Sequence, residues 1–439
     1  MQTSSPHRLR IITVLVVLAL AGASGAPAAA QDVVTIRVFW STWGPIYDEL
    51  MTRIGERYEA EHPGVKIEWS FNTGWQDKLV TLVATGLSPD VTYTNWVGIA
   101  DLARSGTLLP LDTFVEKEGW TRDQFVPAMW DAVQHNGRMY AVPGGGDYIA
   151  LFYNKNVFSE SGLDPERPPH TVAELEAFSD RIYRVDAQGA YTRVGYTPGN
   201  YLHWAYIFGG EFYNEDRTQV TMDHPGNVAA LEWLEALANK WDMNKINAFW
   251  QGKPGSAAAN NPFVTGQSAF MINGFWAYEP IDLYGADMEY GVAPIPTLEG
   301  TEAEMSRYLI QGWYVAIPYG AKNPEAAWEF IRWAFVERAA EMGAYTLNGP
   351  TPIASFREFN ELLAAQIGPG NRLIPYLDVF NQIAYHGSKY FPGTPITMEY
   401  YNRVNEAQSL VLGGREAPRQ VLERFTRSLQ AQLDAALGR

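Results

Sequence analysis

The spacing of apolar side chains changes repeatedly along the chain, from every second residue to every third or fourth. Residues 65–71 alternate between apolar and polar side chains, which predicts a strand with one buried face. Residues 33–40 predict another strand. Between the two strands, apolar side chains recur every four positions over residues 46–58, which predicts an amphipathic helix. Alternation of this kind predicts an α/β protein with mostly parallel sheets that are covered by helices.

Four further helices have recognisable start signals or apolar faces. Thr171 and Glu174 have the spacing of a capping box, and Asp223 is expected to cap the next helix. Asn323-Pro324 is typical of a helix start. From Ala417 onward, apolar residues recur with helical spacing. Residues 31–439 are too many for one hydrophobic core, and they predict two domains.

The N-terminal segment indicates export from the cytoplasm. A basic stretch at residues 7–10 precedes an apolar run over residues 11–21 and an Ala-Ala-Ala ending before Gln31. These features are typical of a secretory signal peptide, which we expect to occupy residues 1–30 and to be cleaved near Ala30. The apolar run is shorter than the roughly 20 residues that span a bilayer. The alternative is an N-terminal anchor that is not cleaved.

Composition excludes several classes of function. The sequence contains no cysteine, which excludes disulfides, thiolate metal sites, a cysteine nucleophile and a lipid anchor on cysteine. We therefore expect a protein that diffuses freely in the periplasm. The formal charge of −16 becomes more negative once Arg8 and Arg10 are removed. Such a surface repels nucleic acid and anionic lipid, so we expect no nucleic acid partner.

Motifs that would mark an enzyme or a metal site are missing from the sequence. It has no phosphate-binding G-x-x-x-x-G-K-[ST] loop, no H-E-x-x-H pair, no G-x-S-x-G turn and no EF-hand loop. No two histidines after residue 31 lie within five residues of each other. Gly144-Gly145-Gly146 lacks dinucleotide-binding spacing, and we expect these glycines to act as a backbone pivot. We therefore predict no catalytic residue, no cofactor and no metal.

Several segments in fixed order resemble the bacterial extracellular solute-binding proteins of ABC importers, specifically family 1, the sugar-binding, maltose-binding-protein-like group. The most distinctive is Leu-Phe-Tyr-Asn-Lys at residues 151–155. The other segments are 39–43, 84–91, 102–112, 140–143, 208–210, 263–276 and 291–296. Each segment is weak alone, but their order over essentially the whole mature chain makes the resemblance specific.

The resemblance implies a two-lobed periplasmic-binding-protein fold of type II, whose discontinuous lobes close like a clamp about a hinge. It implies a first lobe of residues 31–146 and 297–346, and a second lobe of residues 147–296 and 347–439. The chain is expected to cross between lobes at residues 144–150, at residues 291–296 and near residues 347–350. Short extended crossings of this kind absorb the backbone rotation of closure.

Sugar sites combine flat apolar faces with a few fixed carboxylates and amides. Positions that match family segments beside the cleft give the ligand-binding candidates Trp40, Trp43, Trp96, Asp147, Trp276, Gly312 and Trp313. Core packing is the alternative for the tryptophans, and a solvated turn is the alternative for Asp147. Trp233, Trp241, Trp328 and Trp333 lie in helical patterns and are assigned to packing or helix surface.

The resemblance implies a periplasmic binding protein, not an enzyme, that captures a sugar and delivers it to the membrane permease subunits of an ABC importer. We expect a monomer and a di- or oligosaccharide ligand. A glycerol phosphate ester or another polyol is the alternative ligand. A secreted glycosidase that uses carboxylates such as Asp147 and Glu279 is an alternative of another class, because carboxylate separation cannot be read from sequence. A chemosensory or adhesion module that shares the fold is a third reading.

Overall fold

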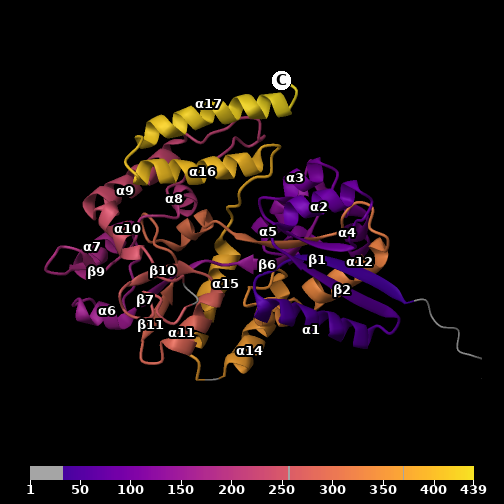
Figure 1. Ribbon diagram of the computed structural model, residues 1–439, viewed down its shortest axis with the longest axis horizontal. Helices are drawn as coiled ribbons and strands as arrows, with labels where there is room; N and C mark the ends of the chain where they lie inside the picture. The colour runs from indigo at the N-terminus through magenta and orange to yellow at the C-terminus, as the bar shows by residue number, and fades with distance from the viewer. Residues whose placement is uncertain (1–32, 256–257, 369) are drawn as a thin grey trace, which may run out of the picture.

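The computed structural model describes residues 33–255, 258–368 and 370–439, so the predicted signal peptide lies outside the described residues. Two sheets organise the chain (Figure 1). The first sheet contains, in spatial order, β2 (Val65–Asn72), β1 (Val34–Ser41), β3 (Val91–Asn95), β12 (Gln311–Ala316) and β6 (Val142–Asp147). β1 runs parallel to β2 and β3, whereas β12 runs antiparallel to β3 and β6.

The second sheet is smaller and entirely antiparallel. Its strands, in spatial order, are β10 (Phe270–Asn273), β7 (Ala150–Asn154) and β11 (Tyr290–Ala293). The prediction of mostly parallel sheets was therefore wrong. In the first sheet, β12 lies between β3 and β6 and runs against both of them. In the second sheet, both neighbours of β7 run against it.

The helices form two groups that lie side by side, each around one sheet (Figure 1). The group around the first sheet is α1 (Pro45–Glu61), α2 (Trp75–Ala84), α3 (Ile99–Arg104), α4 (Asp112–Glu118), α5 (Pro127–Ala132), α12 (Pro324–Arg332) and α13 (Ala339–Thr346). The other group is α6 (Lys155–Glu160), α7 (Val172–Ile182), α8 (Tyr201–Ile207), α9 (Pro225–Lys240), α10 (Met243–Trp250), α11 (Tyr278–Tyr284), α14 (Phe356–Ile367), α15 (Leu377–His386), α16 (Thr397–Leu412) and α17 (Pro418–Ala436). No helix in the described ranges is both long and apolar enough to cross a bilayer.

Most elements that were predicted from local patterns are present. The predicted strands are β1 and β2, and the predicted helices are α1, α7, α9, α12 and α17. The Thr171 side chain caps α7 by accepting a 3.1 Å hydrogen bond from the Glu174 amide. Asp223 does not cap α9. Pro225 is the first residue of that helix, so the cap is His224, whose ring nitrogen accepts from the Gly226 amide at 3.2 Å.

Two segments that connect the sheets run against each other and are hydrogen-bonded. The chain leaves the first sheet after Asp147 and enters the second at Ala150. Gly146 and Gly349 exchange backbone hydrogen bonds of 2.8 and 3.0 Å, which bind residues 347–350 to the end of β6. The Tyr148 hydroxyl donates to the carbonyl oxygen of Pro350 at 2.7 Å. These bonds couple the two segments where the sheets meet.

The connection from β11 to β12 is longer than the predicted crossing. It includes a short 3-10 helix, η3 (Glu302–Arg307), which contacts α8 and α15 of the second group. Arg307 also donates to the Ile207 carbonyl oxygen at 3.1 Å. The sequence-based division starts the second part of the first lobe at residue 297. Because η3 packs on the second group, we propose a boundary nearer to Gln311.

The triple glycine makes room for aromatic rings. A Cβ atom on Gly144 or Gly145 would lie 2.3 to 2.6 Å from atoms of the Trp313 ring, and one on Gly146 would lie 2.3 Å from the Tyr148 ring. Gly145 and Gly146 are paired with β12, the register shifts at Gly144, and none of the three glycines has a positive φ angle. Close packing of rings therefore explains the absence of side chains at these positions, and their use as a backbone pivot stays a prediction.

Candidate binding site

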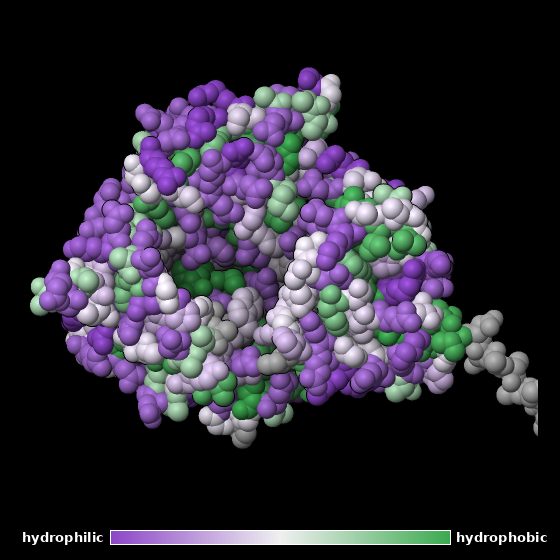
Figure 2. All heavy atoms as spheres, in the orientation of Figure 1, coloured by the Kyte–Doolittle hydropathy of each residue, from purple (hydrophilic) through white to green (hydrophobic). Residues whose placement is uncertain are grey.

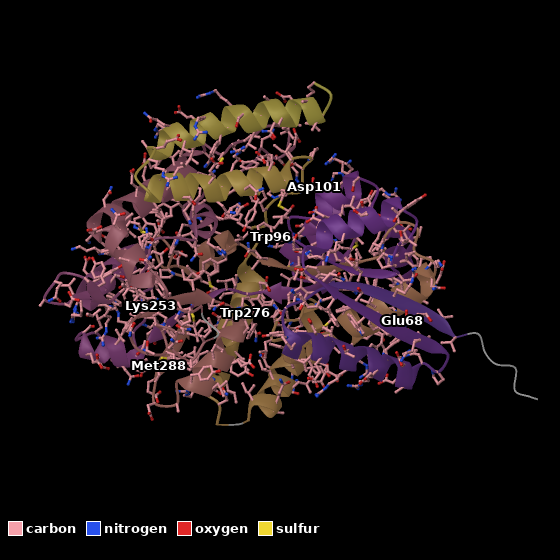
Figure 3. All side chains as sticks on the ribbon, in the orientation of Figure 1. Glu68, Trp96, Asp101, Lys253, Trp276 and Met288 are labelled. Carbon is pink, nitrogen blue, oxygen red and sulfur yellow. The ribbon has the colours of Figure 1, made fainter. Side chains whose placement is uncertain are left out.

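A cavity of about 440 Å³ lies where the two groups of elements meet. Figure 2 shows a hollow between the two groups, and Figure 3 places Trp96 and Trp276 near the same place. The volume of this cavity is within the range that is usual for small-molecule binding sites. The cavity is lined by Trp43, Tyr47, Tyr93, Asn95, Trp96, Asp147, Trp276, Gly312, Trp313, Thr346 and Asn348.

The structure brings together every predicted site residue except Trp40. Trp43 follows β1 and Trp96 follows β3, whereas Gly312 and Trp313 lie on β12. Asp147 ends β6, and Trp276 lies in the short 3-10 helix η2 (Phe275–Ala277) after β10. These residues come from both sheets and from segments far apart in the sequence. Contact of each with a ligand stays a prediction.

Trp40 belongs to the core and does not line the cavity. Its side chain is only 1% exposed. The ring stacks on Phe335 at 5.9 Å between centroids and meets the edges of Trp43 and Trp313 at 6.1 and 5.7 Å. Trp40 lies on β1 and points into the interior, where its ring packs behind Trp43 and Trp313, two rings that line the cavity. Core packing, the alternative reading for this residue, is the correct one.

Trp313 forms part of the cavity wall although it is only 4% exposed. Its ring covers the backbone of Gly144 and Gly145, and its edge contacts Trp43 with centroids 5.6 Å apart. Trp276 lies similarly over Gly274, where a Cβ atom would be 2.3 Å from the ring. Glycine thus allows both tryptophans to lie flat against backbone, which fixes the orientation of their faces.

Asp147 supplies the carboxylate of the cavity. It is half-buried, and its Oδ1 atom accepts a 2.7 Å hydrogen bond from the side-chain amide of Asn348. Burial raises the pKa of Asp147 to about 7, and the hydrogen bond from Asn348 opposes this increase only in part. The lining residues in the described ranges include no lysine or arginine. The carboxylate therefore has no cationic partner within the cavity.

Sequence reasoning missed the lining residues Tyr47, Tyr93, Asn95, Thr346 and Asn348. Tyr93 and Asn95 were detectable, because they alternate along the strand that leads to Trp96 and so share one face of β3. Asn348 lies in a predicted crossing, where the Asn-Gly-Pro sequence was read only as a turn signal. Tyr47 sits on α1 beside the candidate Trp43, with ring centroids 6.5 Å apart. Thr346 carries no signal of its own.

The described lining residues offer groups that suit the binding of a ligand. Glu279, the second carboxylate of the glycosidase alternative, lines a neighbouring cavity with Trp276 and does not line the cavity that holds Asp147. In the described ranges, no group of three or more histidine or acidic side chains is placed to hold a metal ion. Aromatic faces, two amides and one carboxylate suit a ligand that has apolar faces and hydroxyl groups.

The comparisons with known proteins agree with this geometry. Residues 19–341 match the family model described as bacterial extracellular solute-binding protein. The structure of CpMnBP1 with mannobiose bound has a TM-score of 0.74 and 25% identity, covering 90% of this chain and 99% of that chain. The likeness confirms the predicted family resemblance and the two-lobed α/β binding-protein fold.

Two relatives with different ligands are similar to this chain over part of its length. The Maltotriose-binding protein of Pyrococcus abyssi is 25% identical over 303 residues, which cover 67% of this chain and 61% of that protein. The sn-glycerol-3-phosphate-binding periplasmic protein UgpB of Shigella flexneri is 25% identical over 285 residues, covering 61% of this chain and 62% of that protein. In both cases the chain spans less than two thirds of the relative's length.

Proposed function

The chain belongs to the family of bacterial extracellular solute-binding proteins, and from that premise we propose that it captures a di- or oligosaccharide between its two lobes. In this proposal the protein acts in the periplasm as a monomer and delivers the sugar to the permease subunits of an ABC importer. Closure of the lobes about residues 146–150 and 347–350 holds the ligand. The ligand leaves the protein chemically unchanged.

The observation that carries the proposal is the chemistry of the cavity wall. Trp43, Trp96, Trp276 and Trp313 offer ring faces, and Asp147 offers an acceptor for hydroxyl groups. Stacking of a sugar's C–H face on an aromatic ring removes apolar surface of both from water. A buried carboxylate that accepts hydrogen bonds from hydroxyls also disfavours analogues that lack them, because its oxygens would then be unpaired.

The same wall favours a neutral sugar over a glycerol phosphate ester. A phosphate group would enter a site whose one charged lining residue is Asp147, and it would find no lysine or arginine to pair with. Desolvating an anion beside another anion is costly. The relatives named for maltotriose and for sn-glycerol-3-phosphate are similarly distant, so the absence of a cation among the described lining residues supports the choice.

The proposal can be tested with the protein that begins at Gln31. Tryptophan fluorescence is titrated with each ligand, and the melting temperature is measured in parallel. The panel contains maltose and mannobiose series, glycerol 3-phosphate, other polyols and chromogenic glycosides. We expect saturable binding and a raised melting temperature with saccharides alone. Binding of glycerol 3-phosphate instead would favour the alternative ligand, and turnover of a chromogenic glycoside would overturn the proposal of a binding protein.

A pair of tryptophan variants locates the site. Trp276→Ala removes a lining ring and should weaken saccharide binding at least tenfold, which corresponds to about 1.4 kcal/mol. Trp233→Ala is the matched control, because Trp233 packs on Trp204 within the second group with centroids 4.7 Å apart. The control should lower the melting temperature without weakening the binding. Equal losses of affinity in both variants would contradict the assigned site.

A further inference from the structure

A second cavity, which we call the outer cavity, adjoins the one described above. Its volume is about 340 Å³. It shares Trp43, Tyr47 and Trp276 with the cavity that holds Asp147, which we call the inner cavity, so the two cavities adjoin at these three side chains. The outer cavity is lined by Trp43, Gly44, Pro45, Tyr47, Trp276, Ala277, Glu279, Pro280, Leu283 and Tyr284.

The outer cavity has apolar walls from both lobes and opens to solvent along α11. On α11, Leu283 is 67% exposed and Tyr284 is 46% exposed. Neither residue makes a ring contact or a side-chain hydrogen bond within the described part of the chain, and both line the cavity beside Trp276. Tyr47 of α1 lines the same cavity as Glu279, and burial and the charge of Glu279 both raise the pKa of the Tyr47 phenol. Aromatic and apolar side chains left exposed next to a ligand cavity indicate a surface that a ligand covers.

The C-terminal part of the chain packs against Trp96, at the other side of the inner cavity. The edges and faces of Phe391 and Tyr401 meet the Trp96 ring at 6.1 and 5.1 Å between centroids. Gly393 packs so closely on Ala100 that a Cβ atom on the glycine would lie 2.8 Å from the alanine Cβ. In Figure 3, Trp96 lies between Asp101 and Trp276. The outer cavity adjoins the inner cavity on the side of α11, whereas the C-terminal segment packs on the Trp96 side.

We propose that the outer cavity is a second sugar subsite and that the cleft binds a linear oligosaccharide by one end. The terminal units occupy the inner cavity between Trp96 and Trp276. The following units leave past Trp43 and Tyr47 and cover Leu283 and Tyr284. This proposal rests on the proposed function, because it assigns the length and the orientation of the saccharide that the same cleft holds.

A chain-length series tests the subsite. Dissociation constants are measured for maltose to maltohexaose and for mannobiose to mannohexaose with the wild type, Leu283→Ser, Tyr284→Ala and the control Tyr319→Ala. Tyr319 is 61% exposed and lines neither cavity. The wild type and the control should bind the longer saccharides at least tenfold more tightly than the disaccharide. In the two α11 variants this difference in affinity should be about threefold or less. Equal ratios in all four proteins would overturn the subsite.

Labelled saccharides test the orientation of the ligand. The saccharide that binds best is prepared with a bulky fluorophore on its reducing end and, separately, on its non-reducing end. One derivative should bind within about threefold of the free saccharide, and the other should lose at least a hundredfold. Equal binding of both derivatives, or loss of both, would overturn the one-ended cleft. If no unlabelled saccharide binds at all, the proposed function itself fails, and that result is distinct from either outcome.

Discussion

The side-chain amide of Asn348 donates a 2.7 Å hydrogen bond to the carboxylate of Asp147, and this bond joins two of the segments that connect the sheets. Asp147 ends β6, and Asn348 follows Leu347, whose φ angle is +55°. The backbone pair Gly146 and Gly349 lies directly beside this bond. A ligand that contacts Asp147 therefore acts on a group that is bonded to both segments at the hinge.

Asp147 should make ligand affinity depend on pH near neutrality. Burial raises its pKa to about 7, so the carboxyl is protonated in much of the protein at pH 6 and ionised at pH 8. Hydroxyl donors of a sugar favour the ionised form, so the affinity should rise with pH through 7 and then level off. Below pH 7 the affinity should fall by up to tenfold per pH unit until the pKa of the complex is reached. Isothermal titration from pH 5 to pH 8.5 measures the change.

The variant Asp147→Asn should bind the sugar more weakly and should show a flat pH profile. Glu68→Gln is the matched control, since Glu68 is an exposed carboxylate on β2, away from the cleft in Figure 3. The control should keep the wild-type profile. A flat profile in the wild type would show that the charge state of Asp147 does not affect binding.

The same carboxyl should make the unliganded fold less stable as the pH rises. Its pKa is about 4 in the unfolded chain and about 7 in the folded one, so folding takes up a proton between these values. A raised folded-state pKa contributes stability that is complete below pH 4 and is lost as the pH rises to 7. The free energy of unfolding of Asp147→Asn minus that of the wild type should therefore increase by roughly 2–4 kcal/mol between pH 4 and pH 8. Urea denaturation at both pH values measures this difference, and a constant difference would contradict it.

The glycines under Trp313 should be required for binding. A methyl group on Gly145 would meet the Trp313 ring at 2.5 Å, so Gly145→Ala must displace the ring or the strand. Such overpacking costs about 1–3 kcal/mol of stability. Because the ring forms part of the cavity wall, saccharide affinity should fall at least tenfold. Gly255→Ala is the control, since nothing lies within 4 Å of the position of its Cβ and its φ is not positive. Unchanged affinity in Gly145→Ala would show that the Trp313 ring does not contact ligand.

The elements of the fold follow from local patterns, whereas their arrangement does not. Period-two alternation predicted β2, and Thr171 with Glu174 predicted the start of α7, because both depend on nearby residues. The antiparallel placement of β12 and of the second sheet depends on pairings between distant segments, such as Trp313 with Gly145. No local signal encodes those pairings, so the inferred parallel sheets were wrong.

For the candidate site, the resemblance to a family predicted positions that periodicity could not. Asp147 and Trp276 carry no periodic signal, and they were found because they match family segments at the cleft. Trp40 and Trp43 looked equivalent in sequence, but only Trp43 lines the cavity. The direction in which each side chain points at the end of β1 decides this, and a strand end leaves that direction open. Tyr47 and Thr346 enter the cavity through tertiary packing alone.

Tyr148 and Gly349 should together control closure of the lobes. A Cβ atom on Gly349 would lie 2.0 Å from the Tyr148 ring, which is completely buried and whose hydroxyl donates to Pro350. Gly349→Ala therefore forces the two connecting segments apart, and the change should alter the equilibrium between open and closed forms. If a variant populates the closed form less than the wild type does, its affinity for the ligand falls by the same factor as the closed population.

Small-angle scattering with and without saccharide measures that equilibrium. The wild type should become more compact when it binds the ligand, and Gly349→Ala should show a smaller change with an affinity at least tenfold lower. Tyr148→Phe is the companion variant, because it keeps the ring and removes only the bond to Pro350. It should retain most of the compaction if ring packing controls closure. Full compaction with wild-type affinity in Gly349→Ala would show that closure does not depend on this contact, and that the lobes move about another segment.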